Sequence, residues 1–175
     1  MRRIVALLAA LAFLSLVSIA PASASTTSSL NGRFALFWPR PADAPRNAPC
    51  DPGVLCGPGQ LADFGPATIT IENDSFDDSG NPNCFDVQHV ETVHLLDGSG
   101  DLVLKGTGTV CWPGHSINSQ DQSSYGNPTK WSFDFIVKGS KSTGVFSGAT
   151  GSGHESFMFA GAVGKWALSG AVVTS

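Results

Sequence analysis

The last third of the chain carries glycine at short intervals inside segments that otherwise have the composition of strands. Between Thr143 and Val173 the sequence reads TGVFSGATGSGHESFMFAGAVGKWALSGAVV, and no helical period of apolar residues runs through it. Glycine inside a strand weakens packing and costs entropy, so it persists where a strand bends, bulges or lies under a large ring. A small closed barrel requires all three. The segment therefore predicts the closing strands of a β-barrel.

The rest of the chain has the same character. In WSFDFIVKG, the residues Trp131, Phe133, Phe135 and Val137 alternate strictly with more polar neighbours, which is typical of a strand with one buried face. Further strands are expected at Leu30–Trp38, Ala67–Glu72, Cys84–Leu96 and Asp101–Trp112, the last two joined by the turn DGSG. With 20 glycines, 11 prolines and no amphipathic helical pattern after the leader, we predict an all-β fold. The expected architecture is a small closed antiparallel barrel of about eight strands.

Three segments are expected to lie outside the strands. A Pro-rich loop is predicted at 39–58, because five prolines follow the first strand within PRPADAPRNAPCDPG. Polar loops are predicted at Asn73–Asn83 and Gly114–Thr129, both rich in Asn, Asp, Ser and Gly.

The N-terminus has the pattern of a secretory signal peptide. Arg2 and Arg3 precede an apolar run that ends in Pro21 and Ala22-Ser23-Ala24, so we predict a signal peptide at 1–24 with cleavage after Ala24. The remainder, 25–175, has the size of one domain, and it has no further apolar stretch of membrane-spanning length. The protein is expected to be secreted.

The charge balance argues against nucleic acid as a partner. Loss of Arg2 and Arg3 lowers the Lys plus Arg count from 10 to 8 against 14 acidic residues, which changes the formal net charge from -4 to -6. Binding to a phosphate backbone needs a basic face that displaces counterions.

The four cysteines all follow the predicted leader, and an even number in an exported chain indicates disulfides. Of the three possible pairings we favour Cys50 with Cys56, because the turn dipeptide Pro52-Gly53 can fold that segment back on itself. Cys84 with Cys111 follows, near the open ends of a hairpin. The spacings lack the paired C-x-x-C form of a zinc site, and no metal or other cofactor is predicted.

A resemblance to known families is carried by GSKSTGVFSGATGSGHESFMFAGAVGKWALSGAVV, Gly139 to Val173. This run resembles the closing strands of allene oxide cyclase-like and dirigent-like β-barrels, in which a glycine-rich segment precedes a final hairpin. It is also similar to small exported proteins of actinobacterial type. The resemblance implies an eight-stranded, calycin-like barrel with a central cavity. It does not carry cyclase chemistry, because the active-site residues of that family have no residue-by-residue counterparts on this chain, and catalytic residues stay unknown.

Four residues are the candidates for ligand binding inside such a barrel: His89, Glu91, Asp134 and His154. On a strand, His89 and Glu91 share a face while His94 points to the other. The pair could be a general base with its orienting group, or the polar face of a hairpin. His154, beside Glu155, is placed at a barrel rim, where barrels hold ligands.

Other polar motifs carry weaker predictions. Two predicted turns carry several side-chain oxygens each: Asp97, Ser99 and Asp101 in one, and Asp74, Asp77 and Asp78 in the other. We interpret them as solvated turns rather than calcium sites. Ser147 lacks the G-x-S-x-G spacing of a hydrolase nucleophile.

Three functions from different classes stay open at this point. The first is an exported barrel that binds a small apolar ligand or a protein partner without catalysis. The second is a cyclase- or dirigent-type enzyme that steers a reactive intermediate. The third is a surface or envelope platform whose interior is plugged by Trp131, Phe133, Phe135, Phe157 and Trp166. Whether polar or ionisable side chains point into the cavity would distinguish the enzyme from the binder, and a filled interior would favour the platform.

Overall fold

The computed structural model describes residues 24–37, 50–51, 54–81, 84–111, 131–160 and 163–175. The predicted signal peptide up to residue 23 and the predicted loop Gly114–Thr129 lie outside these residues, as does most of the Pro-rich loop.

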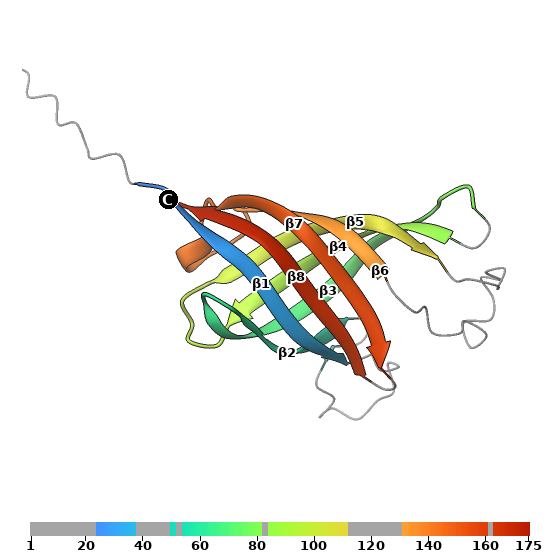
Figure 1. The fold of residues 1–175 in the computed structure, drawn as a ribbon, viewed down its shortest axis with the longest axis horizontal. Coiled ribbons are helices and arrows are strands. Elements are labelled where there is room, and N and C mark those ends of the chain that lie inside the picture. The colour runs from blue at the N-terminus through green and yellow to red at the C-terminus, as the bar shows by residue number, and fades with distance from the viewer. Residues whose placement is uncertain (1–23, 38–49, 52–53, 82–83, 112–130, 161–162) are drawn as a thin grey trace, which may run out of the picture.

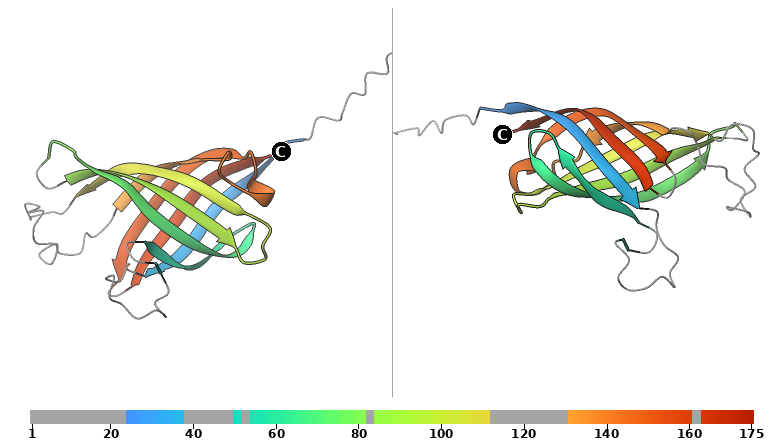
Figure 2. Two further views of the ribbon diagram at one scale, coloured as in Figure 1. Left: turned by 180° about the vertical axis from the view of Figure 1, so that it is seen from behind. Right: turned by 60° about the horizontal axis from the view of Figure 1, so that its bottom comes forward.

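Eight antiparallel strands form one closed barrel in which every strand pairs with the next along the chain and the last pairs with the first (Figures 1 and 2). The strands are β1 (Thr26–Phe37), β2 (Leu55–Leu61), β3 (Gly65–Asp78), β4 (Cys84–Leu95), β5 (Asp101–Cys111), β6 (Trp131–Val137), β7 (Thr150–Ala160) and β8 (Val163–Thr174). Among the described residues the only helical element is a 3₁₀ turn, η2 (Gly144–Phe146). The predicted all-β barrel of eight strands is confirmed.

Several glycines of the last two strands lie beneath large aromatic rings, as the sequence predicts. Gly153 on β7 and Gly170 on β8 are partners in the ladder, and a Cβ on either would lie within 3 Å of the tip of the Phe135 ring. Gly164 stands under Phe157 in the same way, since a Cβ there would lie 2.1 Å from the ring. Large interior rings therefore occupy the space that these glycines leave free.

The Pro-rich loop ends earlier than predicted, because β2 begins at Leu55 rather than after residue 58. Gly57 and Gly59, which in the sequence suggest a turn, lie in β2 where the backbone of β1 passes very close. A Cβ on Gly57 would lie 1.7 Å from the carbonyl oxygen of Ala35, so only glycine fits there.

The predicted polar loop Asn73–Asn83 is also partly wrong, because β3 continues to Asp78. The ladder with β4 runs on past a register shift between Asn73 and Ser75 and ends at Asp78 opposite Phe85. Phe76, Asp77 and Asp78 are exposed there. A strand whose faces both meet solvent has no apolar alternation to reveal it.

One end of the barrel is closed by η2 and its flanking residues. Phe146 is fully buried, and its ring lies 4.8 Å from that of Phe64, centroid to centroid. The N–H of Val145 donates to the carbonyl of Ser99 over 3.0 Å, and a Cβ on Gly144 would lie 1.9 Å from that same carbonyl oxygen. The link between β6 and β7 is thus fastened to the β4–β5 turn.

Aromatic side chains from β6, β7 and β8 fill part of the interior. The ring of Trp166 lies 5.8 Å from Phe133 and 5.4 Å from Phe157, and the ring of Trp131 lies 5.2 Å from Phe157. All but the partly buried Trp131 are buried, as is Phe135. The five side chains that the platform hypothesis names therefore do lie in the core.

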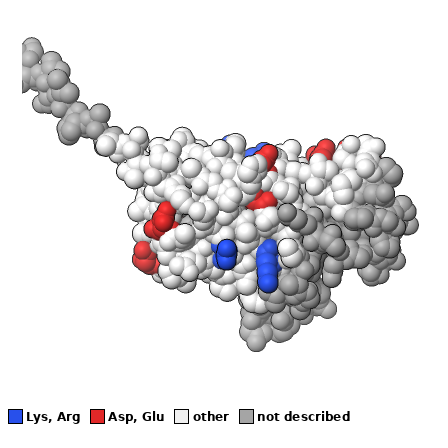
Figure 3. Space-filling model, in the orientation of Figure 1, with Lys and Arg blue, Asp and Glu red and all other residues white. Residues whose placement is uncertain are grey.

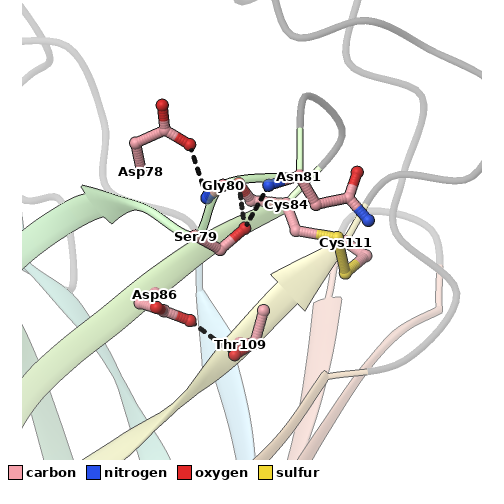
Figure 4. Close-up of a disulfide and its surroundings, with 8 residues drawn as sticks. All are labelled: Asp78, Ser79, Gly80, Asn81, Cys84, Asp86, Thr109 and Cys111. Carbon is pink, nitrogen blue, oxygen red and sulfur yellow. Dashed lines mark hydrogen bonds between the residues drawn. A yellow bond between two sulfur atoms is a disulfide. The ribbon is translucent and has the colours of Figure 1, made fainter.

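Both predicted disulfides are present, Cys50–Cys56 and Cys84–Cys111. Cys84 and Cys111 are direct partners in the β4–β5 ladder, with their Cα atoms 4.1 Å apart. Figure 4 shows the second bridge beside the β3–β4 turn, where Ser79 donates to the carbonyl of Cys84 over 3.0 Å. Loop-closure entropy gives about 2.4 kcal/mol for the short bridge and about 3.6 kcal/mol for the longer one.

Candidate functional site

Three ionisable side chains from two strands meet inside the barrel. On β4, His89 and Glu91 share the inward face with Val87 and Val93, and on β7 Glu155 points inward. The Nε2 atom of His89 lies 3.2 Å from Glu91 Oε1 and 3.1 Å from Glu155 Oε2. Since all three side chains are buried, they form a charged cluster in an otherwise apolar core, here called the interior triad.

A glycine on the neighbouring strand makes room for the histidine ring. Gly106 on β5 is the ladder partner of His89. A Cβ at this position would lie 2.1 Å from His89 Nε2 and 2.8 Å from Glu155 Oε1. No other residue type fits without moving the interior triad, so the glycine in LVLKGTGTV positions it.

Aromatic rings form one wall of the interior triad. The imidazole of His89 meets Phe133 edge to face at a centroid distance of 4.7 Å, and Trp166 at 5.6 Å. This wall keeps the surroundings of the charges apolar, so their mutual interactions are stronger than in water.

Burial and the two carboxylates set the protonation of His89. Burial disfavours the imidazolium and by itself would lower its pKa. The hydrogen bond with Glu155, the close contact with Glu91 and the charges of both groups outweigh this and raise the pKa of His89 to about 9. His89 is therefore a cation at neutral pH.

The pKa of Glu91 is raised, so this carboxyl group favours its protonated form. Burial raises its pKa well above the ordinary value, and repulsion from the Glu155 carboxylate adds to the rise, while contact with His89 opposes it. Glu91 therefore favours its protonated form in this buried site.

The interior triad does not satisfy its own hydrogen-bonding capacity. Among the described residues, neither oxygen of Glu91 has a hydrogen-bond partner, although Oε1 contacts the His89 ring, and Glu155 Oε1 has none either. The indole N–H of Trp166 is likewise buried without an acceptor in the described part of the chain. Buried polar groups of this kind are rare in native proteins and mark strain, catalysis, or a place for a water, ion or ligand.

The other two predicted ligand-binding residues, Asp134 and His154, lie on the opposite face of the wall. Their side chains are 73% and 76% exposed, and His154 Nδ1 contacts Asp134 Oδ1 across the β6–β7 ladder. The predicted four residues thus form two separate pairs, one inside and one outside. His94 also points outward, as predicted, and pairs with Asp101.

Glu155 is the functional residue that the sequence reasoning placed wrongly, at a rim with His154. The alternation of side chains along a strand could have placed it, because Glu155 is two residues from the buried Phe157 and so shares its face. His154 lies on the opposite face. The glycines around it obscure the alternation.

A hollow on the outer surface lies apart from the interior triad. A depression of about 330 Å³ lies on the outside of β4, β5 and β6, and its lining includes Gln88, Lys105, Thr107, Asp134, Ile136 and Lys138. On the face shown in Figure 3, Lys and Arg are interspersed with Asp and Glu, and neither sign gathers into a patch.

In both oxygen-rich turns a carboxylate accepts a hydrogen bond from a nearby backbone N–H group. Asp97 accepts a hydrogen bond from the N–H of Ser99 over 2.9 Å, which lowers the pKa of that carboxyl, and Asp78 accepts one from Gly80 over 2.8 Å. These contacts agree with solvated turns rather than calcium loops.

Comparison with protein-family models, with curated proteins and with solved structures gave no match. The resemblance to allene oxide cyclase-like and dirigent-like barrels therefore stays a prediction. In the described part of the chain, no helix is both long and apolar enough to cross a membrane.

Proposed function

We propose that the protein is an exported β-barrel that binds a small, largely apolar molecule in its interior without catalysis. The observation that carries this proposal is the interior triad, whose buried carboxylate oxygens lack hydrogen-bond partners among the described residues. A polar group of the bound molecule would meet these oxygens, and the aromatic wall would meet its apolar body. Ligand sites in proteins generally combine an apolar lining with a few polar groups in this way.

The triad is a poor choice if stability alone is required. Buried ionic groups can be replaced by well-packed apolar residues with no loss of stability, and often with a gain. A barrel that served only as a platform would fill this space with Leu, Val or Phe, as it does elsewhere in the core. The platform hypothesis is supported by the packed aromatic residues, but it gives no reason for the triad.

Export is supported by the two disulfides, which leave no free cysteine among the described residues. Disulfides persist in oxidising compartments and are rare in the cytosol. Together with the predicted leader, they support the proposal that the protein works outside the cytosol.

A cyclase- or dirigent-type enzyme is the second candidate, favoured by the protonation of the triad. An imidazolium with a pKa of about 9 beside a carboxyl group whose pKa is also raised offers two buried proton donors. Such groups suit a reaction in which a cavity steers an intermediate and a proton is delivered at one point. The two functions share one site and differ in whether the bound molecule is converted.

Native mass spectrometry of the protein purified from its secreting host tests the proposal. We expect an adduct of a few hundred daltons on the folded protein that disappears on denaturation. The matched variants are Glu91→Leu inside the barrel, which should lose the adduct, and Asp134→Leu outside, which should keep it. Conversion of the released molecule by fresh protein would favour the enzyme. An apoprotein mass in every sample, at full recovery of folded material, would contradict both and favour the platform.

A further inference from the structure

We propose that the interior triad is a binding site for a divalent transition-metal cation, held by His89 Nε2 and by the carboxylates of Glu91 and Glu155. This inference deepens the proposed function, because it names what the triad holds and what the polar group of a bound molecule would meet.

The spacing of the donor atoms fits a metal centre. One imidazole nitrogen and one oxygen from each carboxylate all lie within 4.8 Å of one another, and the two nitrogen–oxygen distances are 3.1 and 3.2 Å. Metal bonds to imidazole and carboxylate are about 2.0–2.2 Å long, which puts neighbouring ligand atoms roughly 3.0–3.5 Å apart. A cation can therefore enter this set with small side-chain movements.

The unused oxygens are an independent observation that points into the same space. Glu91 is 0% exposed, and neither of its oxygens has a hydrogen-bond partner among the described residues. Glu155 Oε1 is in the same state. A cation would use these lone pairs, which the surrounding apolar side chains cannot.

Charge and ligand type indicate which cations fit. A neutral imidazole with two carboxylates carries a charge of −2, which one divalent ion neutralises in a site that tolerates little net charge. Imidazole is a ligand that suits zinc, copper, iron and nickel more than calcium or magnesium. All four cysteines are in disulfides, so thiolate is not part of this set.

Three protein ligands leave a coordination position open. Sites with three protein ligands generally take water or a bound molecule in the next position, whereas structural zinc sites are closed by four. The buried N–H of Trp166, whose indole lies beside the His89 ring, has no acceptor in the described part of the chain and can donate to a group in that position.

The outer wall offers matched controls. His154 with Asp134 and His94 with Asp101 pair the same kinds of donor, but each pair is exposed and has only two members. Adventitious metal would bind such pairs weakly, and a variant that removes both exposed histidines leaves the interior triad intact.

The experiment uses the whole chain without its leader, with both disulfides intact. The protein is unfolded in urea and refolded with excess Co²⁺ or Zn²⁺, so that the ion can reach the buried side chains of the interior triad. It is then dialysed against a weak chelator. We expect about one ion per chain by elemental analysis, and visible d–d absorption bands for the Co²⁺ form.

Variants assign the ion to the triad. Glu91→Gln and Glu155→Gln should each lower retention at least tenfold, while the His94→Gln/His154→Gln double variant should retain the ion as the parent does. Circular dichroism confirms that each variant is folded before its metal content is compared. Absence of retained metal in the folded parent protein would overturn the inference, and so would retention that only the His94→Gln/His154→Gln variant loses.

Native mass spectrometry separates this inference from the proposed function. An organic adduct without metal would contradict the inference and leave the proposed function standing. A metal adduct alone would support the inference and contradict binding of an organic molecule. Neither adduct would contradict both.

Discussion

Histidine–carboxylate contacts occur on both faces of the barrel wall, and they differ in burial and in the number of carboxylates that meet the histidine. His154 and Glu155 are neighbours in the sequence, yet one pairs with Asp134 in solvent and the other with His89 in the core. Outside, the pair adds little to stability, because water competes for the contact between the two exposed side chains. Inside, desolvation raises the pKa of Glu91 and the carboxylates raise that of His89. The same side chains are an ordinary surface feature on one face and a potential binding site on the other.

Replacement of the histidine on each face should show the largest difference in the free energy of unfolding. His89→Leu leaves two buried carboxyl groups without their cation, and we expect a loss of about 3–5 kcal/mol in the free energy of unfolding at pH 7. His154→Leu on the outer face should change it by about 0.5 kcal/mol or less. Urea unfolding with the disulfides intact measures both. Losses of equal size would mean that burial does not distinguish the pairs.

The pH dependence of stability should follow the interior triad. The folded pKa of His89 is about 9 against 6.5 for the free side chain, so its stabilising contribution is complete below pH 6.5 and is lost as the pH rises through about 9. Glu91, whose pKa is also raised, prefers its protonated form in the folded state and changes stability in the same direction above pH 4.5.

In chelator-containing buffer we therefore expect stability to fall from pH 5 to pH 9, at up to about 1.4 kcal/mol per pH unit for each proton. His89→Leu should lose the part of the fall between pH 6.5 and 9 that His89 contributes, while the part that Glu91 contributes stays. A stability that increases over that interval in the parent protein would show that His89 is not held as a cation.

Substitution of Gly106 tests whether the interior triad depends on the space beside this glycine. Gly106→Ala places a methyl group 2.1 Å from His89 Nε2, and overpacking of this kind costs about 1–3 kcal/mol. In the double variant His89→Ala/Gly106→Ala the methyl group occupies space left by the ring, so the combined loss should be smaller than the sum of the single losses. Additive losses would place the effect of Gly106 in the backbone rather than in contact with the triad.

Much of the fold could be predicted from the sequence, because the alternation of apolar and polar residues and the glycines within strands both indicate a closed barrel. The alternation in Trp131–Val137 and the pairing of Cys84 with Cys111 both follow from local pattern. β2 could not be recognised, because Gly57 and Gly59 serve the close approach of β1, which no local pattern shows. The polar end of β3 was missed since it has no buried face there.

Two of the three members of the interior triad could be predicted from the sequence. His89 and Glu91 share a face of one strand, so period two joins them. The third member, Glu155, follows His89 by 66 residues in the chain, and its approach depends on barrel closure and register. Asp134 and His154 are ionisable like the members of the interior triad, but their side chains lie on the outer face. Only the register of β6 against β7 decides this.

The central claim is that the interior triad is kept for binding rather than for stability. The most direct test is the free energy of unfolding of the triple variant His89→Leu/Glu91→Met/Glu155→Met, measured beside the parent in metal-free urea solutions. We predict that the triple variant is at least as stable as the parent, because all three charges are removed together and apolar side chains fill their space. A triple variant less stable than the parent by more than about 2 kcal/mol, larger than the cost of most volume-conserving core changes, would show that the triad is a structural element of the core and would contradict the account.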